Sequence, residues 1–429
     1  MNAAALRRQA WWNVWVGLAI WALIVVMPAA LMPTIYGPIM DDTGWTRGEV
    51  VSFSSFKFAA GAAIAFFLGH IIERFGLSRV MLISMAGTGL SLASLLFARS
   101  LWAYYLAASV LGAAILGCIT SMKVLISRWF SARLGFAIGV ALTGAGIAGL
   151  VVPITATRMT QWIGWRLTAL VLSSTIFIIL IPLYLWKARA SPAELGVTAE
   201  DIDPAPGGTA AATPDSSGPT FRELLRMRAF WAVLAAQTIV GAVDHGMEDH
   251  LPLFLARDAH LGADIAAYGF SITIVVGALG KLGFGRLFDR YSVRAVSFCW
   301  FAMAIGVALA FPVAGLLSFI IFTVVRGLTH GGTLVDIPIC AKHVFGSRAL
   351  AKTIAVFGAA NSLGGALGTG AVGFAHDASG SYTASFVVLS ALAVLAAAII
   401  IRVAPRYWVG YGQRQSTKPS PVPVPASER

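Results

Sequence analysis

The sequence predicts an all-α membrane protein in which twelve transmembrane helices form two pseudo-symmetric bundles of six. Three observations predict this fold: an apolar composition, the grouping of the apolar segments, and a repeat of half the chain. Of the 429 residues, 58% are hydrophobic and 12% are charged, whereas a soluble domain carries about 25% charged residues. So little charge cannot cover a chain of this length in water, and we infer that lipid surrounds most of it.

Twelve apolar segments are of the length that crosses a bilayer, which is about 20 residues. Their approximate ranges are 12–36, 50–72, 80–98, 101–127, 134–157, 165–187, 229–255, 266–287, 294–314, 316–340, 351–374 and 384–403. The first is too long for the core of a signal peptide and has no clean cleavage site after it, so we interpret it as a retained transmembrane helix.

A polar stretch rich in Pro, Gly, Ala, Ser and Thr separates the sixth segment from the seventh. We therefore expect a first bundle over residues 1–187, a linker over 188–226, a second bundle over 227–405, and a disordered tail over 406–429.

The basic residues are distributed unevenly between the two sides of the predicted membrane. If the N-terminus is cytoplasmic, 22 of the 31 Lys and Arg residues fall in cytoplasmic segments and 5 in the opposite loops. Cytoplasmic loops of membrane proteins carry such an excess, so we expect both termini and the linker in the cytoplasm of a cell (inner) membrane protein. The net charge of +12 forms no stripe with interleaved aromatic residues, and we expect no nucleic-acid binding.

The two halves of the chain repeat. Matching motifs recur at an offset of 215 or 216 residues: Gly69-His-Ile-Ile-Glu73-Arg74 with Gly285-Arg-Leu-Phe-Asp289-Arg290, Phe130-Ser-Ala-Arg133 with Phe345-Gly-Ser-Arg348, and Gly112, Gly117 and Gly149 with Gly327, Gly332 and Gly364. A repeat with an even number of helices gives two bundles of the same orientation. That architecture suits a central site between bundles that rock against each other.

The two Gly-x-x-x-(Asp/Glu)-Arg loops resemble the signature of the major facilitator superfamily. Five further motifs are similar to its monocarboxylate and oxalate/formate branch: Gly44-Trp-Thr-Arg47, Arg128-Trp-Phe-Ser-Ala-Arg-Leu-Gly135, Ser191-Pro-Ala-Glu-Leu-Gly196, His250-Leu-Pro252 and Asp377-Ala-Ser-Gly-Ser-Tyr382. The resemblance covers residues 11–403 and implies two six-helix bundles around a central cavity. It also implies that six loop residues gate the bundles: Gly69, Glu73, Arg74, Gly285, Asp289 and Arg290. The alternative is that these are solvated loop charges.

Ionisable residues inside the apolar segments are candidates for function because each costs free energy to insert into a membrane. The clearest is Arg326, which lies about ten residues into its segment and therefore near the membrane centre. Its repeat counterpart is the apolar Leu111, so the fold itself does not require a charge there. We predict that Arg326 binds a substrate anion, because its planar fork can hold both oxygens of a carboxylate. A structural ion pair with Asp244 is the alternative.

Five further residues complete the predicted substrate site. Lys281 matches the helix-8 cation, usually Arg, that binds the substrate carboxylate in the family that the chain resembles. Lys123 near the cytoplasmic side, Lys57 toward the outer side, His250 and Asn361 are the others. For the lysines the alternative is a side chain that extends to the membrane surface, and for His250 it is a structural hydrogen bond.

Acidic residues in the seventh and tenth segments are the predicted proton carriers. Gln237, Asp244 and Glu248 share one helix face, and a desolvated carboxylate can take up and release a proton. Asp336 is a third candidate, and structural pairing with Arg326 is the alternative for the acids. His245 and His250 are five residues apart, so they do not chelate a metal from one face, and we expect no metal.

We therefore predict a secondary active transporter of a small organic anion, a mono- or dicarboxylate, that works by alternating access and proton symport. Carboxylate exchange is the main alternative, and a non-transporting membrane receptor is a more distant one. The sequence has no clustered nucleophile, metal triad or cofactor motif, so we expect neither an enzyme nor a cofactor. We expect the protein to work as a monomer.

Overall fold

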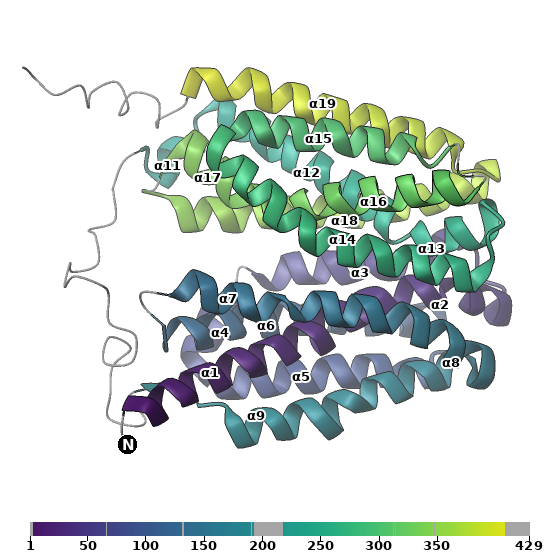
Figure 1. Cartoon of the computed structure of the whole chain (residues 1–429), viewed down its shortest axis with the longest axis horizontal. Helices are drawn as coiled ribbons and strands as arrows, with labels where there is room; N and C mark the ends of the chain where they lie inside the picture. The colour runs from purple at the N-terminus through teal and green to yellow at the C-terminus, as the bar shows by residue number, and fades with distance from the viewer. Residues whose placement is uncertain are drawn as a thin grey trace, which may run out of the picture.

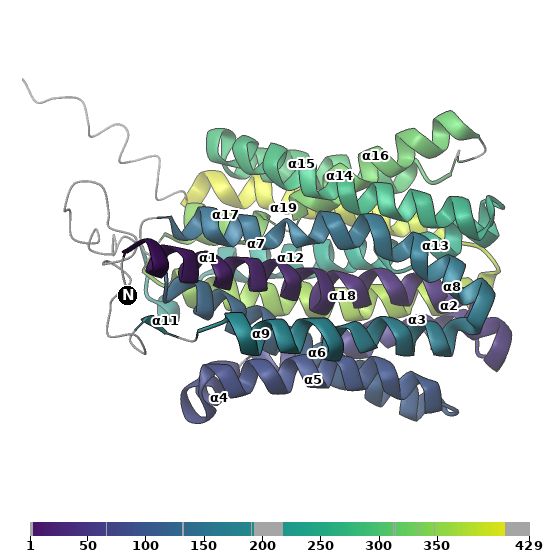
Figure 2. The same cartoon turned by 60° about the horizontal axis from the view of Figure 1, so that its bottom comes forward.

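The computed structural model describes residues 3–65, 67–130, 133–189, 191–192, 218–311, 313, 315–333, 335–346 and 348–407. Long helices run side by side and form two bundles, one from each half of the chain (Figures 1 and 2). The start of α1 and the end of α19 lie at one end of the molecule (Figure 1). We call the opposite end, which carries the connections at 44–46, 98–100 and 259–261, the distal end.

The first bundle contains six membrane-spanning segments. They are α1 (Ala3–Ile20) with η1 (Trp21–Val26) and α2 (Met27–Thr43); α3 (Arg47–Ala65) with α4 (Leu68–Phe75); α5 (Leu77–Ser94) with η2 (Leu95–Phe97); α6 (Leu101–Ser127); α7 (Leu134–Leu142) with the first part of α8 (Gly144–Thr175); and the rest of α8 with η3 (Ile176–Leu180) and α9 (Ile181–Lys187). The fifth and sixth segments meet at Gly164, whose φ of 77° interrupts α8.

The second bundle also contains six segments. They are α12 (Arg228–Glu248) with α13 (Leu251–Leu253) and η5 (Phe254–Asp258); α14 (Gly262–Tyr291); α15 (Val293–Ala308); α16 (Leu316–Thr333) with α17 (Asp336–Phe345); α18 (Leu350–Ser379); and α19 (Thr383–Tyr407). Most residues of the predicted linker lie outside the described residues, although α11 (Phe221–Leu224) forms with Thr220 as its cap.

Length and composition alone identify fewer membrane spans than the twelve segments described above. Within the described residues, eight helices qualify, and α3 with α4 adds a ninth as a bent pair. The kink at Gly164 divides one of the eight into two segments. The shorter α15 and the interrupted α12–η5 complete the twelve, in agreement with the predicted all-α fold.

The predicted ranges locate the segments, but several helices are longer. The first runs from Ala3 to Thr43 rather than over 12–36, because backbone hydrogen bonds continue past the residues that an apolar count includes. The prediction of one tenth helix over 316–340 was wrong, since α16 ends at Thr333 and α17 begins at Asp336. Pro338 cannot donate a hydrogen bond to the carbonyl four residues earlier, and its ring clashes there. Residues 406 and 407, assigned to the tail, belong to α19, and 408–429 lie outside the described residues.

Glycines bring helix backbones into direct contact at matching places in the two halves. A methyl group at Gly112 of α6 would lie 1.9 Å from the Lys57 carbonyl oxygen of α3. At the corresponding place in the second half, a methyl at Gly327 of α16 would lie 2.6 Å from the Thr273 carbonyl oxygen of α14. Only glycine permits such close approach, so these repeated glycines share one packing role.

Two helix pairs of the second bundle are joined by several such contacts. A methyl at Gly364 or Gly368 of α18 would lie within 2.2 Å of a carbonyl oxygen of α12, and one at Gly331 of α16 would lie 2.1 Å from the Gly277 carbonyl oxygen of α14. The pairs α12–α18 and α14–α16 are among the most extensive helix contacts in the described residues, whereas α12 and α16 approach each other at few positions.

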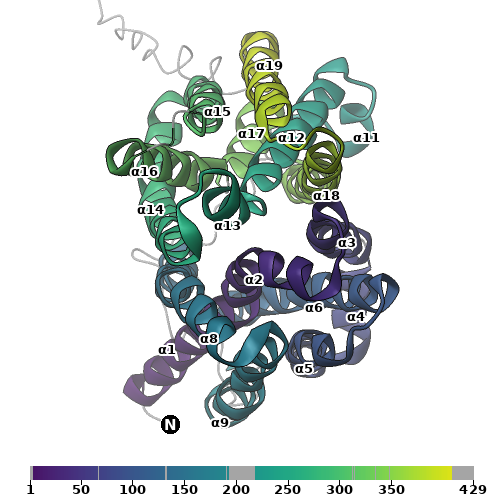
Figure 3. The same cartoon turned by 90° about the vertical axis from the view of Figure 1, so that its right-hand side faces the viewer.

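The bundles meet along three helix pairs, seen from the distal end in Figure 3. There α3 lies beside α18, α8 lies beside α14, and α13 lies close to α2. The seventh, eighth and eleventh segments thus stand at the boundary between the bundles, and the tenth lies behind the eighth, packed against it.

Candidate functional site

A buried charge cluster joins the seventh segment to the tenth. The Arg326 Nη2 atom lies 2.8 Å from Asp244 Oδ1 and 3.2 Å from Glu248 Oε2, and it donates a 2.7 Å hydrogen bond to the Asp244 carbonyl oxygen. Asp244 Oδ2 also contacts His330 Nδ1 and accepts from the Thr333 hydroxyl, each at 3.0 Å. Asp244 and Glu248 lie one helical turn apart on α12, which is why both reach the same guanidinium.

The members of this cluster differ in exposure. The side chain of Arg326 is fully buried and that of Asp244 is 2% exposed, whereas Glu248 is 12% and His330 15% exposed. Within the described residues, the Arg326 Nη1 and Nε atoms have no hydrogen-bond partner. A buried donor without an acceptor is costly, so this guanidinium has donors left for the oxygen atoms of a ligand.

The backbone of Lys281 on α14 packs against α16, the helix that carries Arg326 and His330. The Lys281 backbone nitrogen would be 2.9 Å from a methyl at Gly331 of α16, and a methyl one turn earlier, at Gly277, would be 3.5 Å from the His330 ring. No ion pair or hydrogen bond of the Lys281 ammonium is found among the described residues, and its side chain is half-buried. Lys281 and Arg326 therefore come from facing helices, with His330 on the same turn of α16 that faces α14.

The other predicted substrate residues lie elsewhere. Lys123 on α6 is exposed, and Asn361 on α18 donates a 3.3 Å hydrogen bond to the Gln237 carbonyl oxygen of α12. Lys57 donates to the Ser54 hydroxyl at 3.2 Å and its ammonium lies 4.3 Å from the centre of the Phe58 ring. The Phe58 ring in turn packs against the His245 ring across the bundle boundary, with their centres 4.3 Å apart.

His250 and Asp336 are buried in different surroundings. Both ring nitrogens of His250 are engaged, with the Tyr382 hydroxyl at 2.8 Å and the Thr369 carbonyl oxygen at 3.0 Å, so it ties the seventh segment to the eleventh and twelfth. Asp336 accepts a 2.6 Å hydrogen bond from the Trp300 indole, and its other oxygen has no partner among the described residues. No ion pair of Asp336 is found among those residues.

The predicted gating residues lie at the end of the molecule that carries the start of α1. Gly69, Glu73 and Arg74 belong to α4, and Gly285 and Arg290 belong to the last turns of α14. The guanidinium of Arg74 stacks on the neighbouring Phe75 ring and that of Arg290 on the neighbouring Tyr291 ring. Asp289 lies on α14 one residue before Arg290.

A second set of charges joins the bundles at the distal end. Arg47 Nη1 pairs with Asp258 at 2.8 Å, and Arg257 Nη2 pairs with Asp41 at 2.5 Å. Asp377 accepts hydrogen bonds from the backbone nitrogens of Arg47 and Gly48, at 3.0 and 2.7 Å, and so caps the N-terminus of α3 from the opposite bundle. We call Asp41, Arg47, Arg257, Asp258 and Asp377 the distal clamp.

Sequence reasoning missed two parts of this arrangement. His330 and Thr333 follow Arg326 at intervals of four and seven residues, and this helical spacing could have placed them beside Arg326. No sequence pattern links the members of the distal clamp, because Asp377 is 330 residues from Arg47. The structure nevertheless brings together three motifs that the sequence singled out separately: the one ending at Arg47, the one containing His250, and the one running from Asp377 to Tyr382.

Two bundles of six membrane-spanning segments, with ionisable side chains buried inside them, form the architecture found in many transporters. Residues 13–294 and 251–423 match the family described as the Major Facilitator Superfamily. The chain belongs to this superfamily, and it is a multi-pass membrane transporter rather than an enzyme.

Curated relatives narrow the resemblance within the superfamily. The chain is 25% identical over 338 residues to monocarboxylate transporter 12-B of Danio rerio, covering 74% of this chain and 70% of the relative. It is 28% identical over 326 residues to monocarboxylate transporter 13 of Bos taurus, with coverages of 74% and 71%. The predicted resemblance to a monocarboxylate-type branch is thus confirmed.

Solved structures confirm the fold. A bacterial homolog of the human lysosomal transporter Spinster, in an inward-facing and occupied conformation, superposes with a TM-score of 0.68 at 16% identity and covers 92% of this chain and 97% of that one. The nucleoside transporter NupG gives a TM-score of 0.67 at 12% identity, with coverages of 93% and 99%.

Proposed function

We propose that this transporter carries a small organic anion, a mono- or dicarboxylate, together with a proton. The observation that carries the proposal is the composition of the buried cluster: two carboxylates share one guanidinium. Unless Asp244, Glu248 or His330 binds a proton, the cluster holds one negative charge in excess, which is unfavourable in a site of low polarity. The cluster is therefore suited to bind one proton.

The same geometry supports a coupling mechanism. Arg326, His330 and Thr333 all hold Asp244. Glu248 is held more loosely, at 3.2 Å from Arg326 and 3.9 Å from His330, and is partly exposed. A proton on Glu248 removes one of the two anions that compete for Arg326. The substrate carboxylate then takes that place, with Lys281 on the facing helix as a second cation. Anion and proton thus bind together, as in a symporter.

The distal clamp supports an assignment of the conformational state. It holds the bundles together at the distal end, and we assign that end to the outside because the Lys and Arg distribution favours cytoplasmic termini. Transport then requires the distal clamp to open while the opposite end closes. We therefore propose a cell membrane protein with the linker and both termini in the cytoplasm.

Carboxylate exchange is the second candidate, and Lys281 is the observation that favours it. No carboxylate pairs with Lys281 among the described residues. A carrier that changes conformation with an empty site would therefore hold an uncompensated cation, which disfavours the return step unless an anion is bound. Net uptake driven by a pH gradient would distinguish symport from exchange, because an exchanger needs an anion on the far side.

The test begins with a thermal-shift screen of the purified protein against carboxylates, since a ligand that binds only the folded state raises the melting temperature. The strongest binder is then offered, radiolabelled, to proteoliposomes that contain no internal anion. Accumulation that rises as the outside becomes more acidic supports symport. Uptake that requires an internal carboxylate supports exchange, and absence of both excludes organic-anion transport.

A further inference from the structure

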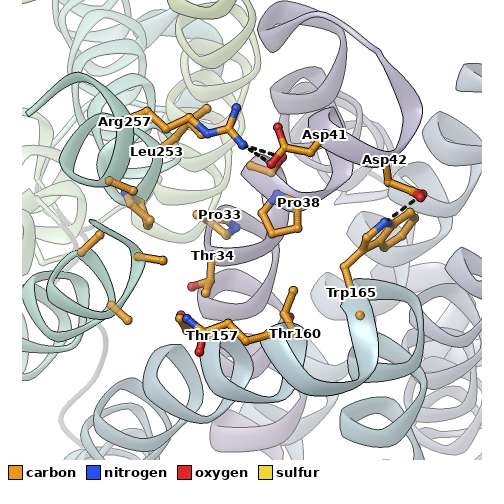
Figure 4. Close-up of a pocket in the computed structure, with 18 residues that line it drawn as sticks. Pro33, Thr34, Pro38, Asp41, Asp42, Thr157, Thr160, Trp165, Leu253 and Arg257 are labelled. Atoms are coloured by element: carbon orange, nitrogen blue, oxygen red, sulfur yellow. Dashed lines mark hydrogen bonds and ion pairs between the residues drawn. The ribbon is translucent and has the colours of Figure 1, made fainter. Parts of the chain in front are cut away.

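A cavity of about 640 Å³ lies at the distal end, outside the cluster described above. Helices of both bundles line it: α2, α8, α13 with η5, and the start of α14. Its volume falls within the range of about 300–1,000 Å³ that is usual for small-molecule sites. Figure 4 shows Arg257 and Asp41 at one edge of the cavity, Thr157 and Thr160 at the opposite edge, and Pro33 and Pro38 between them.

Arg257 is the cation of this cavity. Its Nη2 atom donates to the Gly37 carbonyl oxygen at 2.9 Å and pairs with Asp41 at 2.5 Å. A methyl at Gly37 would lie 3.1 Å from Nη2 and 3.3 Å from Nε, so the guanidinium rests directly on α2. Within the described residues its Nη1 and Nε atoms make no hydrogen bond, and 35% of the side chain is exposed. Donors therefore remain for an added carboxylate.

The remaining walls suit an apolar body. Pro33, Pro252, Leu253 and several alanines of α14 line the cavity. Its second acid, Asp42, pairs with Arg166 and accepts a 3.2 Å hydrogen bond from the Trp165 indole, so its charge is already compensated. The remaining competitor for Arg257 is Asp41, whose side chain is 65% exposed and can leave the guanidinium for water.

We propose that this cavity is an external binding site for a small organic anion, whose carboxylate displaces Asp41 from Arg257. The proposal rests on the proposed function for the ligand class and for the outward direction of the distal end. Because the Arg257–Asp41 pair is part of the distal clamp, the incoming anion releases one link between the bundles. A ligand that binds the released arrangement better shifts the molecule toward it, so occupancy of this site favours opening toward the outside.

Protection of an introduced cysteine tests the site directly. Thr160→Cys places a thiol in the cavity, while the native Cys118, Cys299 and Cys340 are buried. The protein in nanodiscs is treated with a cationic methanethiosulfonate reagent at increasing concentrations of benzoate, with uncharged benzamide as the control ligand. Benzoate should slow the reaction saturably and benzamide should not. Absence of protection by benzoate, or equal protection by both, would refute the proposal.

Two substitutions on one ion pair separate binding from a structural effect. Arg257→Gln should raise the half-protecting benzoate concentration about tenfold or more, since a charge-assisted hydrogen bond is lost. Asp41→Asn should lower it by about threefold or more, because the competing carboxylate is gone. Both variants break the same link of the distal clamp. If that link were only structural, the half-protecting benzoate concentration would change in the same direction in both variants, and this result would overturn the proposal.

Lys281→Gln distinguishes this site from the central one. Protection by benzoate should survive this substitution, and its loss would show that the cysteine reports on the central site instead. Uptake into proteoliposomes is measured in parallel. Unprotected cysteine with intact carboxylate uptake refutes the external site alone, whereas absence of all carboxylate uptake refutes the proposed function on which it rests.

Discussion

Arg257 and Asp258 are consecutive residues of opposite charge, and each pairs with a different helix of the other bundle. Arg257 pairs with Asp41 near the end of α2, and Asp258 pairs with Arg47 at the start of α3. Both lie in η5, whose last turn directs the two side chains apart. The two first segments of one bundle are thus held by a single turn of the other.

We expect Asp258→Asn to weaken closure of the distal end. Loss of a partly buried ion pair worth about 1 kcal/mol shifts a two-state equilibrium roughly fivefold. The measurement is the labelling rate of Ser54→Cys by a membrane-impermeant reagent applied from outside, because Ser54 is buried beneath the distal clamp and hydrogen-bonded to Tyr36. Labelling should accelerate. Asp264→Asn, at an exposed acid of α14, is the matched control.

Asp244→Asn should destabilise the protein, whereas Asp336→Asn should not. The first removes the carboxylate that Arg326, His330 and Thr333 all contact, and breaking a buried pair costs on the order of 3 kcal/mol. The second keeps an oxygen that can accept the Trp300 hydrogen bond. Melting temperatures of the purified variants provide the measurement. Equal melting temperatures for the two variants would contradict a structural role for the pairing of Asp244 with Arg326.

Glu248→Gln should separate exchange from proton-driven accumulation. The amide cannot take up a proton, so accumulation driven by an acidic outside should be lost, while exchange of labelled for unlabelled substrate should continue. Both assays use the same proteoliposomes, and the exchange rate serves as the control for folding. Unchanged accumulation in Glu248→Gln would move the proton to another residue of the cluster.

Lys281→Gln should weaken substrate affinity by roughly ten- to a hundredfold, the loss expected for one charge-assisted hydrogen bond. Lys281→Arg should stay close to wild type because the cation remains. Arg326→Lys should be nearly as harmful as Arg326→Ala, since an ammonium cannot form the two-pronged contact. Binding to the purified, folded variants is the measurement, with Lys342→Gln at an exposed position as the control. Wild-type affinity in Lys281→Gln would exclude it from the site.

The proposed orientation predicts opposite labelling of two exposed positions. A cysteine replacing His260, at the distal connection between η5 and α14, should react with an impermeant reagent added to intact cells. A cysteine replacing Arg222, on α11, should react only after the membrane is opened. The reverse pattern would invert the topology and make the cavity at Arg257 cytoplasmic.

The positions of the helices could be predicted because lipid imposes the same requirement on each segment: about 20 apolar residues with internal backbone hydrogen bonds. The break in the tenth segment could also have been predicted, because Pro338 lies in the first turn of α17 and proline disrupts the helix before it. The repeated glycines were visible as a pattern, but their contact with carbonyl oxygens depends on how the helices cross, which no local sequence reports.

The candidate site was only partly predictable for the same reason. The insertion cost of a charge singles out Arg326, Asp244, Glu248 and Lys281 individually. It does not say which of them pair, because pairing depends on helix rotation within the bundle. Insertion cost does not single out the distal clamp, because Arg47, Asp258 and Asp377 lie at helix ends, where charged residues are common.

The glycine contacts divide the helices that carry the buried charge cluster into two closely packed pairs. Because backbones touch within α12–α18 and within α14–α16, we expect the helices of each pair to move together. Arg326 extends from one pair to Asp244 and Glu248 on the other, across a gap that the backbones scarcely close. The cluster therefore links two closely packed helix pairs through charge, so gain or loss of a proton there should alter how firmly the two pairs are coupled.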